Sequence, residues 1–171
     1  MSHKQVLATI VLALCWSGAQ AATFTVSRVD DSSPNGCMVG DCSLREALLA
    51  ANASVDSDVI QLPSGTFGLT RGTLAISNPV QLRGSTTTPT ILDGDGVQPL
   101  INVTGTPTVL LANVSLQSHG VHALDLSRNA NTTLDQVLVP SSDSQIWAEG
   151  SANGSGSLEI HRSEIRAYTD C

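Results

Sequence analysis

The amino-acid sequence predicts a parallel β-helix, a solenoid whose short strands stack coil upon coil. From residue 58 onward, short runs of Val, Ile and Leu alternate with stretches rich in Gly, Asn, Asp, Pro and Ser, and each run is a candidate strand. Three runs also repeat in register, because Leu111, Leu134 and Ile160 begin matching segments at similar intervals along the chain. A period of about 25 residues is typical of one solenoid coil.

Coils are expected to stack because a single coil cannot bury its own inward aliphatic side chains. Coils about 4.8 Å apart join these side chains into one core and satisfy each other's backbone groups. The aromatic content of 3% fits a narrow interior filled by aliphatic side chains. A β-sandwich is the alternative fold, since its strands also recur every ~8–12 residues. The longer repeat that links Leu111, Leu134 and Ile160 favours the β-helix.

Length and composition limit the range of functions. The chain has 171 residues, enough for one modest domain, with a formal net charge of −7 and a pI near 4.7. Only 13% of its residues are charged, against about 25% in an average domain, so Ser, Thr, Asn and Gly supply most of the surface polarity. An acidic surface repels anionic polymers and excludes a basic nucleic-acid-binding protein. We therefore expect no nucleic-acid partner.

Residues 1–21 are predicted to be a secretory signal peptide. A basic start is followed by the apolar stretch Val6–Leu14, and the small-residue pattern A-x-A ends at Ala21. The apolar core is about ten residues long, short of the ~18 that a membrane-spanning helix needs, and no later stretch is long enough either. An uncleaved anchor and a lipidated Cys15 are the alternatives. We expect cleavage after Ala21 and a secreted or cell-surface protein, periplasmic or extracellular, that begins near Ala22.

Removal of the signal peptide leaves three cysteines, Cys37, Cys42 and Cys171. Cys37 and Cys42 flank a short turn-forming stretch, and in an exported protein such near neighbours are expected to form a disulfide. Zinc binding is disfavoured because a structural site needs four ligands and the remaining histidines lie far downstream. Cys171 has no evident partner in the chain. A free thiol, a bond to a second copy and a partner lost with a longer protein all remain open for it.

One strongly helical segment is predicted at about residues 42–53. Ser43 and Glu46 have the S-x-x-E spacing of a capping box, in which each side chain bonds the backbone N–H of the other residue. Asn52 is a reasonable stop signal. A catalytic Glu46 or an anion-binding Arg45 is the less favoured interpretation, because a capping carboxylate is already engaged. Four apolar residues at helical spacing form one stripe: Leu44, Ala47, Leu48 and Ala51.

Residues 42–47 read CSLREA, and this motif resembles the signature of the CSLREA domain, a family of exported bacterial proteins. The similarity extends over about residues 23–95 and includes Thr23–Val26, the two neighbouring cysteines and Val59–Phe67. The resemblance implies a right-handed parallel β-helix on a secreted or surface protein, frequently one much longer than this chain. It implies no established activity, because the family is defined by its N-terminal pattern and not by a reaction.

The coils are predicted to occupy residues 58–171, after an N-terminal cap region of residues 22–57. In the later coils, the matching segments align at their first, fourth and sixth positions. About five coils fit into this length. Earlier pairs of apolar residues extend the pattern, at intervals slightly shorter than those between the later segments: Ile60 with Leu62, Val80 with Leu82, and Ile101 with Val103.

Both ends of a solenoid need a cover, because open strand edges pair with other chains. The predicted helix can cover the first end. At the other end, Ser157–Arg166 still has a strand pattern, and no cap is evident in the five residues after it. We hypothesise that the chain is the first part of a longer β-helix, or that its last coil closes against a second copy or another surface protein through Cys171.

Parallel β-helices include polysaccharide lyases and hydrolases, so the acids and histidines of the coils are candidate catalytic residues. Asp93 and Asp95 alternate with glycines, which indicates a tight turn before it indicates a carboxylate pair or a calcium site. His122 and Asp125, near His119, have the residue types of an acid–base set, but solvated turn and strand residues are the favoured interpretation. No common hydrolase, metalloprotease, phosphate-loop or dinucleotide motif is present. We therefore assign no catalytic, cofactor-binding or metal-binding residue.

The sequence favours an exported β-helix domain without catalysis, with a structural or ligand-binding role toward carbohydrate or protein. The alternative is a carbohydrate-active lyase or hydrolase, which would place two or three carboxylates and an arginine on one face of adjacent coils. A shortened gene product with no independent role is a third hypothesis. Trp147, Phe67 and Tyr168 are rings that can stack on sugars, and they are not clustered in the sequence.

Overall fold

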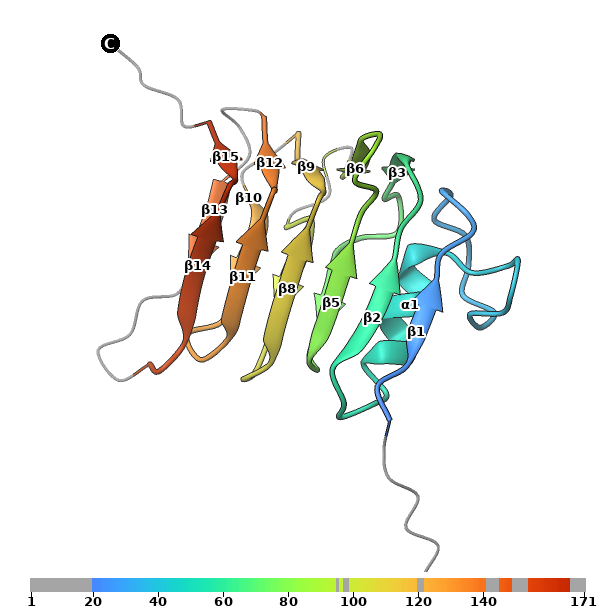
Figure 1. Ribbon diagram of the computed structural model, residues 1–171, viewed down its shortest axis with the longest axis horizontal. Helices are drawn as coiled ribbons and strands as arrows, with labels where there is room; N and C mark the ends of the chain where they lie inside the picture. The colour runs from blue at the N-terminus through green and yellow to red at the C-terminus, as the bar shows by residue number, and fades with distance from the viewer. Residues whose placement is uncertain are drawn as a thin grey trace, which may run out of the picture.

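The computed structural model describes residues 20–94, 96, 99–119, 122–140, 145–148 and 154–166. These residues form a right-handed parallel β-helix of about four turns, with one short helix near its N-terminal end (Figure 1). Each complete turn contributes one strand to each of three sheets. Every pair of neighbouring strands is parallel, which excludes the β-sandwich alternative, whose sheets are antiparallel.

The strands of the three sheets follow one another in chain order. The first sheet contains β1 (Thr23–Thr25), β2 (Asp58–Gln61), β5 (Val80–Arg83), β8 (Thr108–Ala112), β11 (Asn131–Asp135) and β14 (Ser157–His161). The second sheet contains β3 (Gly65–Gly68), β6 (Thr90–Asp93), β9 (Ser115–Gln117), β12 (Leu138–Val139) and β15 (Glu164–Ile165). The third sheet contains β4 (Leu74–Ile76), β7 (Ile101–Val103), β10 (His122–Leu126) and β13 (Gln145–Ala148).

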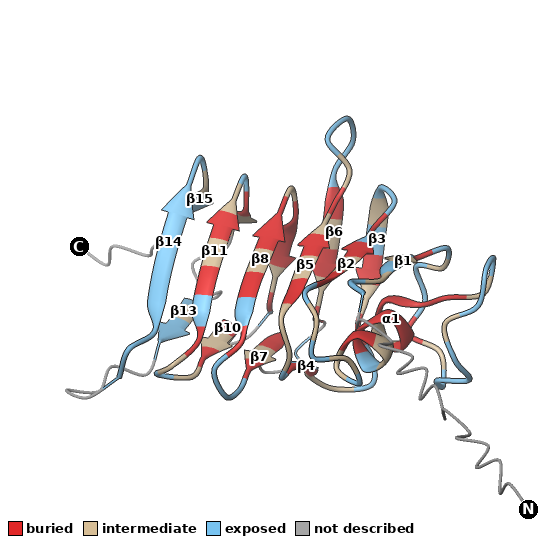
Figure 2. Cartoon of the chain, turned by 60° about the horizontal axis from the view of Figure 1, so that its bottom comes forward, coloured by how far each residue is buried: buried red, intermediate tan, exposed pale blue. Residues whose placement is uncertain are grey.

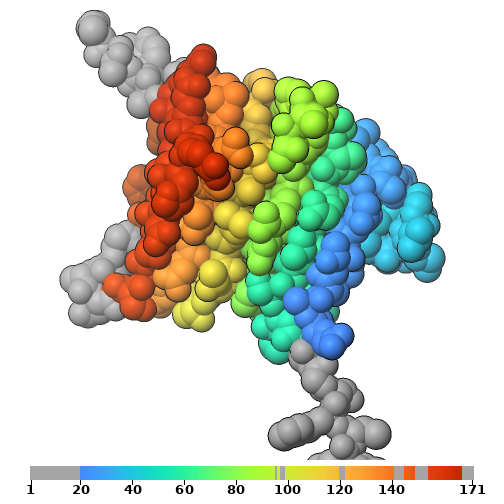
Figure 3. All heavy atoms as spheres, in the orientation of Figure 1, coloured from blue at the N-terminus to red at the C-terminus, as the bar shows by residue number. Residues whose placement is uncertain are grey.

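The chain visits the three sheets in the same sequence in each turn, so that β2, β3 and β4 make the first turn. The fourth turn ends with β13, and β14 and β15 begin a fifth. The predicted number of about five coils therefore includes this unfinished turn. Figure 3 shows the face of the first sheet, on which the successive turns lie side by side as bands that run from blue to red.

The later coils have the predicted register. Leu111 pairs with Leu134, and Leu134 pairs with Ile160, in the first sheet. Val139 and Ile165, at the sixth position of the same repeat, pair in the second sheet. The repeat is regular here because the corner between the first and second sheets is two residues long in each of these turns.

The predicted register of the earlier coils is wrong. Ile60 pairs with Leu82 and not with Val80, so this step is two residues longer than predicted. Ile101 lies in the third sheet, and the next member of the ladder after Leu82 is Leu111. The second turn is longer because six residues separate β5 from β6 and seven separate β6 from β7. Side chains along a strand point alternately inward and outward. A register shift of two residues between neighbouring strands therefore leaves the apolar pattern unchanged.

Stacked aliphatic side chains fill the interior of the solenoid. Figure 2 shows that buried residues recur along the strands of successive turns. In the first sheet, Ile60, Leu82, Leu111 and Leu134 lie one above another and are fully buried. Burying one such side chain contributes about 1.5–3 kcal/mol, so these ladders supply most of the stabilisation. The other two sheets contribute similar ladders: Phe67, Leu92 and Leu116 in the second, and Leu74, Ile101 and Leu124 in the third.

A left-handed residue forms each tight corner between the first and second sheets. Asn113, Gln136 and Arg162 occupy equivalent places in successive turns and have φ values of 56°, 54° and 47°. The turn before them has Gly84 at this place. Gly84 lies so close to the next turn that an added Cβ would be 2.1 Å from the carbonyl oxygen of Asn113. The missing side chain of Gly84 therefore lets the two turns stack.

Helix α1 (Leu44–Ala51) covers the first end of the solenoid and lies against β2 and β4 (Figure 1). It begins after the N-cap residue Ser43 and ends at the C-cap residue Asn52, within the predicted range of 42–53. Its apolar stripe joins the buried core: Leu44, Ala47, Leu48 and Ala51.

Within the described residues, no helix covers the far end of the solenoid as α1 covers the first. Strands β13, β14 and β15 each have a paired strand on one side only within the described ranges. The inward side chains Leu158 and Ile160 of β14 are consequently 36% and 47% exposed. Closure of this end against a partner stays a prediction, and Cys171 lies outside the described residues.

Candidate functional site

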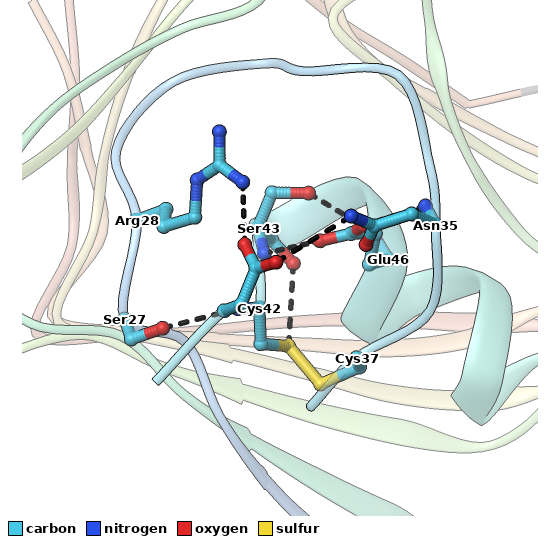
Figure 4. Close-up of a disulfide and its surroundings, with 8 residues drawn as sticks. Ser27, Arg28, Asn35, Cys37, Cys42, Ser43 and Glu46 are labelled. Carbon is cyan, nitrogen blue, oxygen red and sulfur yellow. Dashed lines mark hydrogen bonds and ion pairs between the residues drawn. A yellow bond between two sulfur atoms is a disulfide. The ribbon is translucent and has the colours of Figure 1, made fainter. Parts of the chain in front are cut away.

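A disulfide between Cys37 and Cys42 holds the N-terminal cap region together (Figure 4). Cys42 is fully buried, and Met38 and Asp41 exchange backbone hydrogen bonds across the turn between the two cysteines. Cys42 directly precedes the N-cap residue Ser43 of α1. The disulfide therefore fixes the point at which the helix begins.

Replacing Cys37 and Cys42 by alanine is expected to lower the free energy of unfolding by about 2 kcal/mol, the loop-entropy contribution of so small a ring. Urea unfolding of the variant and of the wild type measures this difference. Wild-type protein unfolded in the presence of a reductant should match the variant. No loss, or a loss that reductant does not reproduce, would contradict this role.

Glu46 is a structural carboxylate. Its backbone N–H donates to the Ser43 hydroxyl, and one of its carboxylate oxygens accepts from the backbone N–H of Ser43 at 2.7 Å, so both bonds of the capping box are present. Its other carboxylate oxygen accepts from the backbone N–H of Asn35 at 2.8 Å. Burial raises the pKa of Glu46, but these hydrogen bonds outweigh burial and leave the pKa below its ordinary value. An ionised carboxylate with both oxygens engaged does not suit a general acid.

Arg45 binds Asp31, a partner that the sequence pattern does not reveal. Its guanidinium donates to both carboxylate oxygens of Asp31, at 2.7 and 2.9 Å, and to two carbonyl oxygens of the loop 70–73. Asp31 also accepts from two backbone N–H groups of the same loop. These bonds join the segment before α1, the helix and the loop before β4. The geometry therefore gives Arg45 a structural role and not an anion-binding one.

The candidate acids and histidines of the coils form two pairs. Nε2 of His119 lies 3.3 Å from a carboxylate oxygen of Asp93, and Nδ1 of His122 lies 2.8 Å from Oδ1 of Asp125. Asp95 lies outside the described residues. The sequence places His119 near His122 and Asp125 and does not reveal its pairing with Asp93. These two residues meet because β6 and β9 are neighbours in the second sheet, which adjacency in the sequence does not show.

His122 and Asp125 line a pocket on the outer face of the third sheet. The pocket has a volume of about 320 Å³. Asn102, Asp125 and Trp147 face one another across β7, β10 and β13. Trp147 is 52% exposed, and its indole stacks on the His122 ring with centres 5.5 Å apart and planes 6° from parallel. We call this pocket the Trp147 groove and define it by Asn102, Thr104, His122, Asp125, Ser127 and Trp147.

A β-bulge aims His122 toward Trp147. Between His122 and Leu124, strand β10 advances by two residues while β13 advances by one. Regular alternation would put His122 and Leu124 on the same face, but here Ala123 and Leu124 are both fully buried. His122 is left on the outer face beside Asp125, which is a known effect of bulges near functional sites. The polar and apolar pattern of β10 does not reveal the extra residue.

A second polar group lies on the outer face of the first sheet, on β11, on β14 and at the corner that follows β14. Nε of Arg162 donates to Asp135 at 2.9 Å, and the carboxylate of Glu159 lies 3.4 Å from His161. This group resembles the set of carboxylates and arginine expected of a carbohydrate-active enzyme. The hydrogen bond from Arg162 lowers the pKa of Asp135, and the same bond raises the pKa of Arg162. The carboxylate stays ionised and the guanidinium stays protonated, which suits neither a general acid nor a proton-abstracting base.

Comparisons with protein-family models, with curated proteins and with solved structures found no match for this chain. Within the described ranges, no group of three or more His, Cys, Asp or Glu could hold a metal ion. The same residues contain no helix long and apolar enough to cross a membrane. The Trp147 groove combines a half-exposed ring with several polar side chains in one pocket and is therefore the candidate functional site.

Proposed function

We propose that this chain is an exported, non-catalytic β-helix domain that binds carbohydrate in the Trp147 groove. The observation that carries the proposal is the half-exposed indole of Trp147, which lies flat on His122 beside the carboxylate of Asp125. Stacking holds the indole in one orientation. A flat aromatic face next to polar side chains matches a sugar ring, which is apolar on its faces and polar around its rim.

The groove offers complementary contacts for both parts of a sugar. The indole of Trp147 can cover the apolar C–H face of a pyranose ring. The Asp125 carboxylate can accept hydrogen bonds from sugar hydroxyls, and the Asn102 amide can both donate and accept them. The Ser127 hydroxyl donates to the carbonyl oxygen of Gly105 at 2.7 Å and can still accept a bond from a sugar. The net charge of −7 disfavours an anionic uronate polymer. We therefore expect a neutral or amino-sugar glycan.

The carboxyl groups whose pKa shifts are resolved do not match the catalytic acid of a glycosidase. A glycosidase needs one carboxylic acid with a raised pKa. Burial acts in that direction and is the largest single influence on the pKa of Asp31 and of Glu46, but hydrogen bonds from arginine and backbone N–H groups together overcome it. Within the described residues, the pKa shifts resolved for carboxyl groups are all downward: Asp30, Asp31, Asp41, Glu46 and Asp135.

Export is supported by the disulfide between Cys37 and Cys42, since disulfides persist in oxidising compartments. Residues 1–19, most of the expected signal peptide, lie outside the described residues. Under this proposal the chain is a member of the exported CSLREA family, which its motif resembles, and it is located outside the bacterial cytoplasm. The mass of the secreted protein tests this part of the proposal and should correspond to a first residue of Ala22.

Carbohydrate binding can be measured through Trp147 itself. Trp16 lies in the expected signal peptide, so Trp147 is the sole tryptophan of the processed chain. We expect soluble oligosaccharides of chitin or cellulose to change its fluorescence in a saturable way. His122→Ala removes the ring that holds the indole in one orientation and should weaken binding about tenfold or more. His161→Ala removes a histidine that pairs with Glu159 on another face and should leave the affinity unchanged.

A second measurement uses insoluble chitin or cellulose in a pull-down assay, because it does not depend on tryptophan fluorescence. Trp147→Ala should abolish retention of the protein. Retention equal to that of the wild type would contradict the proposed site. Release of reducing or unsaturated ends during the incubation would instead support a carbohydrate-active enzyme, and binding to surface proteins without glycan binding would change the ligand class.

A further inference from the structure

We propose that cleavage after Ala21 creates an α-ammonium group on Ala22 that pairs with the buried carboxylate of Asp58 and locks β1 onto the solenoid. This inference rests on the export and signal cleavage proposed above. It makes Asp58 the ion-pair partner of the processed N-terminus, at a site separate from the Trp147 groove.

Asp58 is a buried carboxylate whose hydrogen bonding is incomplete. The residue begins β2 and is 0% exposed. Oδ1 accepts a hydrogen bond from the backbone nitrogen of Ala22 at 2.7 Å. Oδ2 is buried and has no hydrogen-bond partner in the part of the chain that the structure describes. A buried charge with a single neutral donor carries a large desolvation cost, so a further partner is expected at this place.

The strand ladder fixes the position of the Ala22 nitrogen. The carbonyl oxygen of Ala22 accepts from the backbone N–H of Val59 at 2.8 Å, and Thr23 pairs with Val59 in register. The A-x-A pattern of the expected signal peptide ends at Ala21, so the bond expected to be cleaved is the one that frees this nitrogen. A sequence pattern and a buried acid thus point independently to the same atom.

Cleavage changes both the charge and the donor capacity of this nitrogen. In the hydrolysis by a peptidase, water supplies a hydroxyl to the carbonyl carbon of Ala21 and a hydrogen to the nitrogen of Ala22, and the new amine takes a proton from solvent. An α-amino group has an ordinary pKa of about 7.7–8.0, so it is mostly charged at neutral pH. The amide nitrogen carries one hydrogen, whereas the ammonium carries three. The ammonium can keep the bond to Oδ1, serve Oδ2 and supply the missing counter-charge.

Processing therefore stabilises the first edge of the solenoid. Before cleavage, the buried carboxylate of Asp58 has one neutral donor. The cost of burying it then offsets part of the stabilisation gained when β1 pairs with β2. After cleavage, a charged pair connects the first residue of the mature chain to the start of β2. The processed protein should therefore be more stable than the unprocessed chain.

Purified chains with defined first residues test the proposal. One begins at Ala22, and the other begins at Gln20 and so keeps an amide at Ala22. In urea unfolding, the equilibrium constant for folding should be about tenfold higher or more for the chain that begins at Ala22. Asp58→Asn should abolish this difference, and Asp56→Asn should preserve it. Equal stability of the two chains, or an equal loss from Asp58→Asn in both, would overturn the proposal.

A chemical test remains decisive even where Asp58→Asn does not fold. Lys4 is the only lysine, so the α-amine of Ala22 is the single primary amine of the processed chain. An amine-reactive acetylating reagent should modify the native chain about tenfold or more slowly than the urea-unfolded chain. Wild-type chain acetylated while unfolded and then refolded should have the lower stability of the chain that begins at Gln20. Fast native acetylation, or unchanged stability after acetylation, would overturn the pairing.

The pairing of Ala22 with Asp58 and the cleavage after Ala21 can be tested separately. The purified chains report on the pairing with Asp58 whether or not a cell makes the cut. Mass spectrometry of the protein secreted by its host tests the cut itself. A secreted protein that begins at a residue other than Ala22 would overturn the processing step, and one that begins at Ala22 would support it.

Discussion

The largest loss of stability is expected from Asp31→Asn, about 3–5 kcal/mol in the free energy of unfolding. The Asp31 side chain is 1% exposed, and its ion-pair partner Arg45 is 14% exposed. The substitution keeps the volume of the side chain but removes its charge, which leaves the guanidinium without a counter-charge. It also removes an acceptor oxygen, so backbone N–H groups of the loop 70–73 face an amide group instead.

The neighbouring residue supplies a matched control for this prediction. Asp30 also pairs with an arginine, Arg28, but both side chains are accessible to solvent. Asp30→Asn should therefore change the stability little, since exposed ion pairs are screened by water and salt. Urea unfolding of the two variants measures the contrast. Similar losses for Asp30→Asn and Asp31→Asn would contradict the importance of the buried pair.

Asp31 should also make the stability fall in acid. Burial raises the pKa of Asp31, but hydrogen bonds from Arg45 and from the backbone of residues 70 and 71 overcome it and hold the pKa below its ordinary value of 3.8. A carboxyl group with a lowered native pKa stabilises the fold above its ordinary pKa, and this contribution is lost as the pH falls through the native value. As the pH falls below the ordinary value of 3.8, the wild type should lose more stability than Asp31→Asn. Parallel profiles would contradict this expectation.

The second large effect is expected from Gly84→Ala. A Cβ at this residue would lie 2.1 Å from the carbonyl oxygen of Asn113 and 2.9 Å from the Cβ of Thr90. The nearer obstacle is the backbone of the next turn, which cannot move aside as a flexible side chain can. Overpacking a core costs about 1–3 kcal/mol, occasionally more, and we expect a loss of at least about 3 kcal/mol here because two turns must separate.

A second glycine of the same solenoid supplies the control. Gly68 lies at the end of β3, and an added Cβ would meet no atom within 4 Å. Gly68→Ala should therefore change the stability by less than about 0.5 kcal/mol. Urea unfolding of both variants separates a specific collision at Gly84 from a general effect of alanine in the strands. Comparable losses would contradict the close approach of Gly84 to Asn113.

The helix and the later coils could be predicted because their signals are local. The capping box of Ser43 and Glu46 lies within one helical turn, and its hydrogen bonds depend on residues three positions apart. Leu111, Leu134 and Ile160 could be aligned because their turns share the same two-residue corner. A pattern that depends on few residues is recognisable in a single sequence.

The earlier coils could not be aligned because their corners differ in length. The connections of six residues between β5 and β6 and seven between β6 and β7 place Leu111, and not Ile101, next to Leu82. The apolar pattern contains nothing that measures such insertions. The β-bulge in β10 presented the same difficulty. One extra residue turned His122 outward to Trp147, although regular alternation would have turned it inward.

The sequence by itself determined the solenoid class, the capping helix, the Cys37–Cys42 pairing and the acidic, polar surface. These features depend on composition or on residues close together in the chain. Only the tertiary structure decided which side chains meet, as Asp31 with the loop 70–73 and Ala22 with Asp58 show. In a solenoid, contacts between turns depend on how many residues each corner contains. The stacking of whole turns, and not the local pattern, therefore created both the Trp147 groove and the buried site at Asp58.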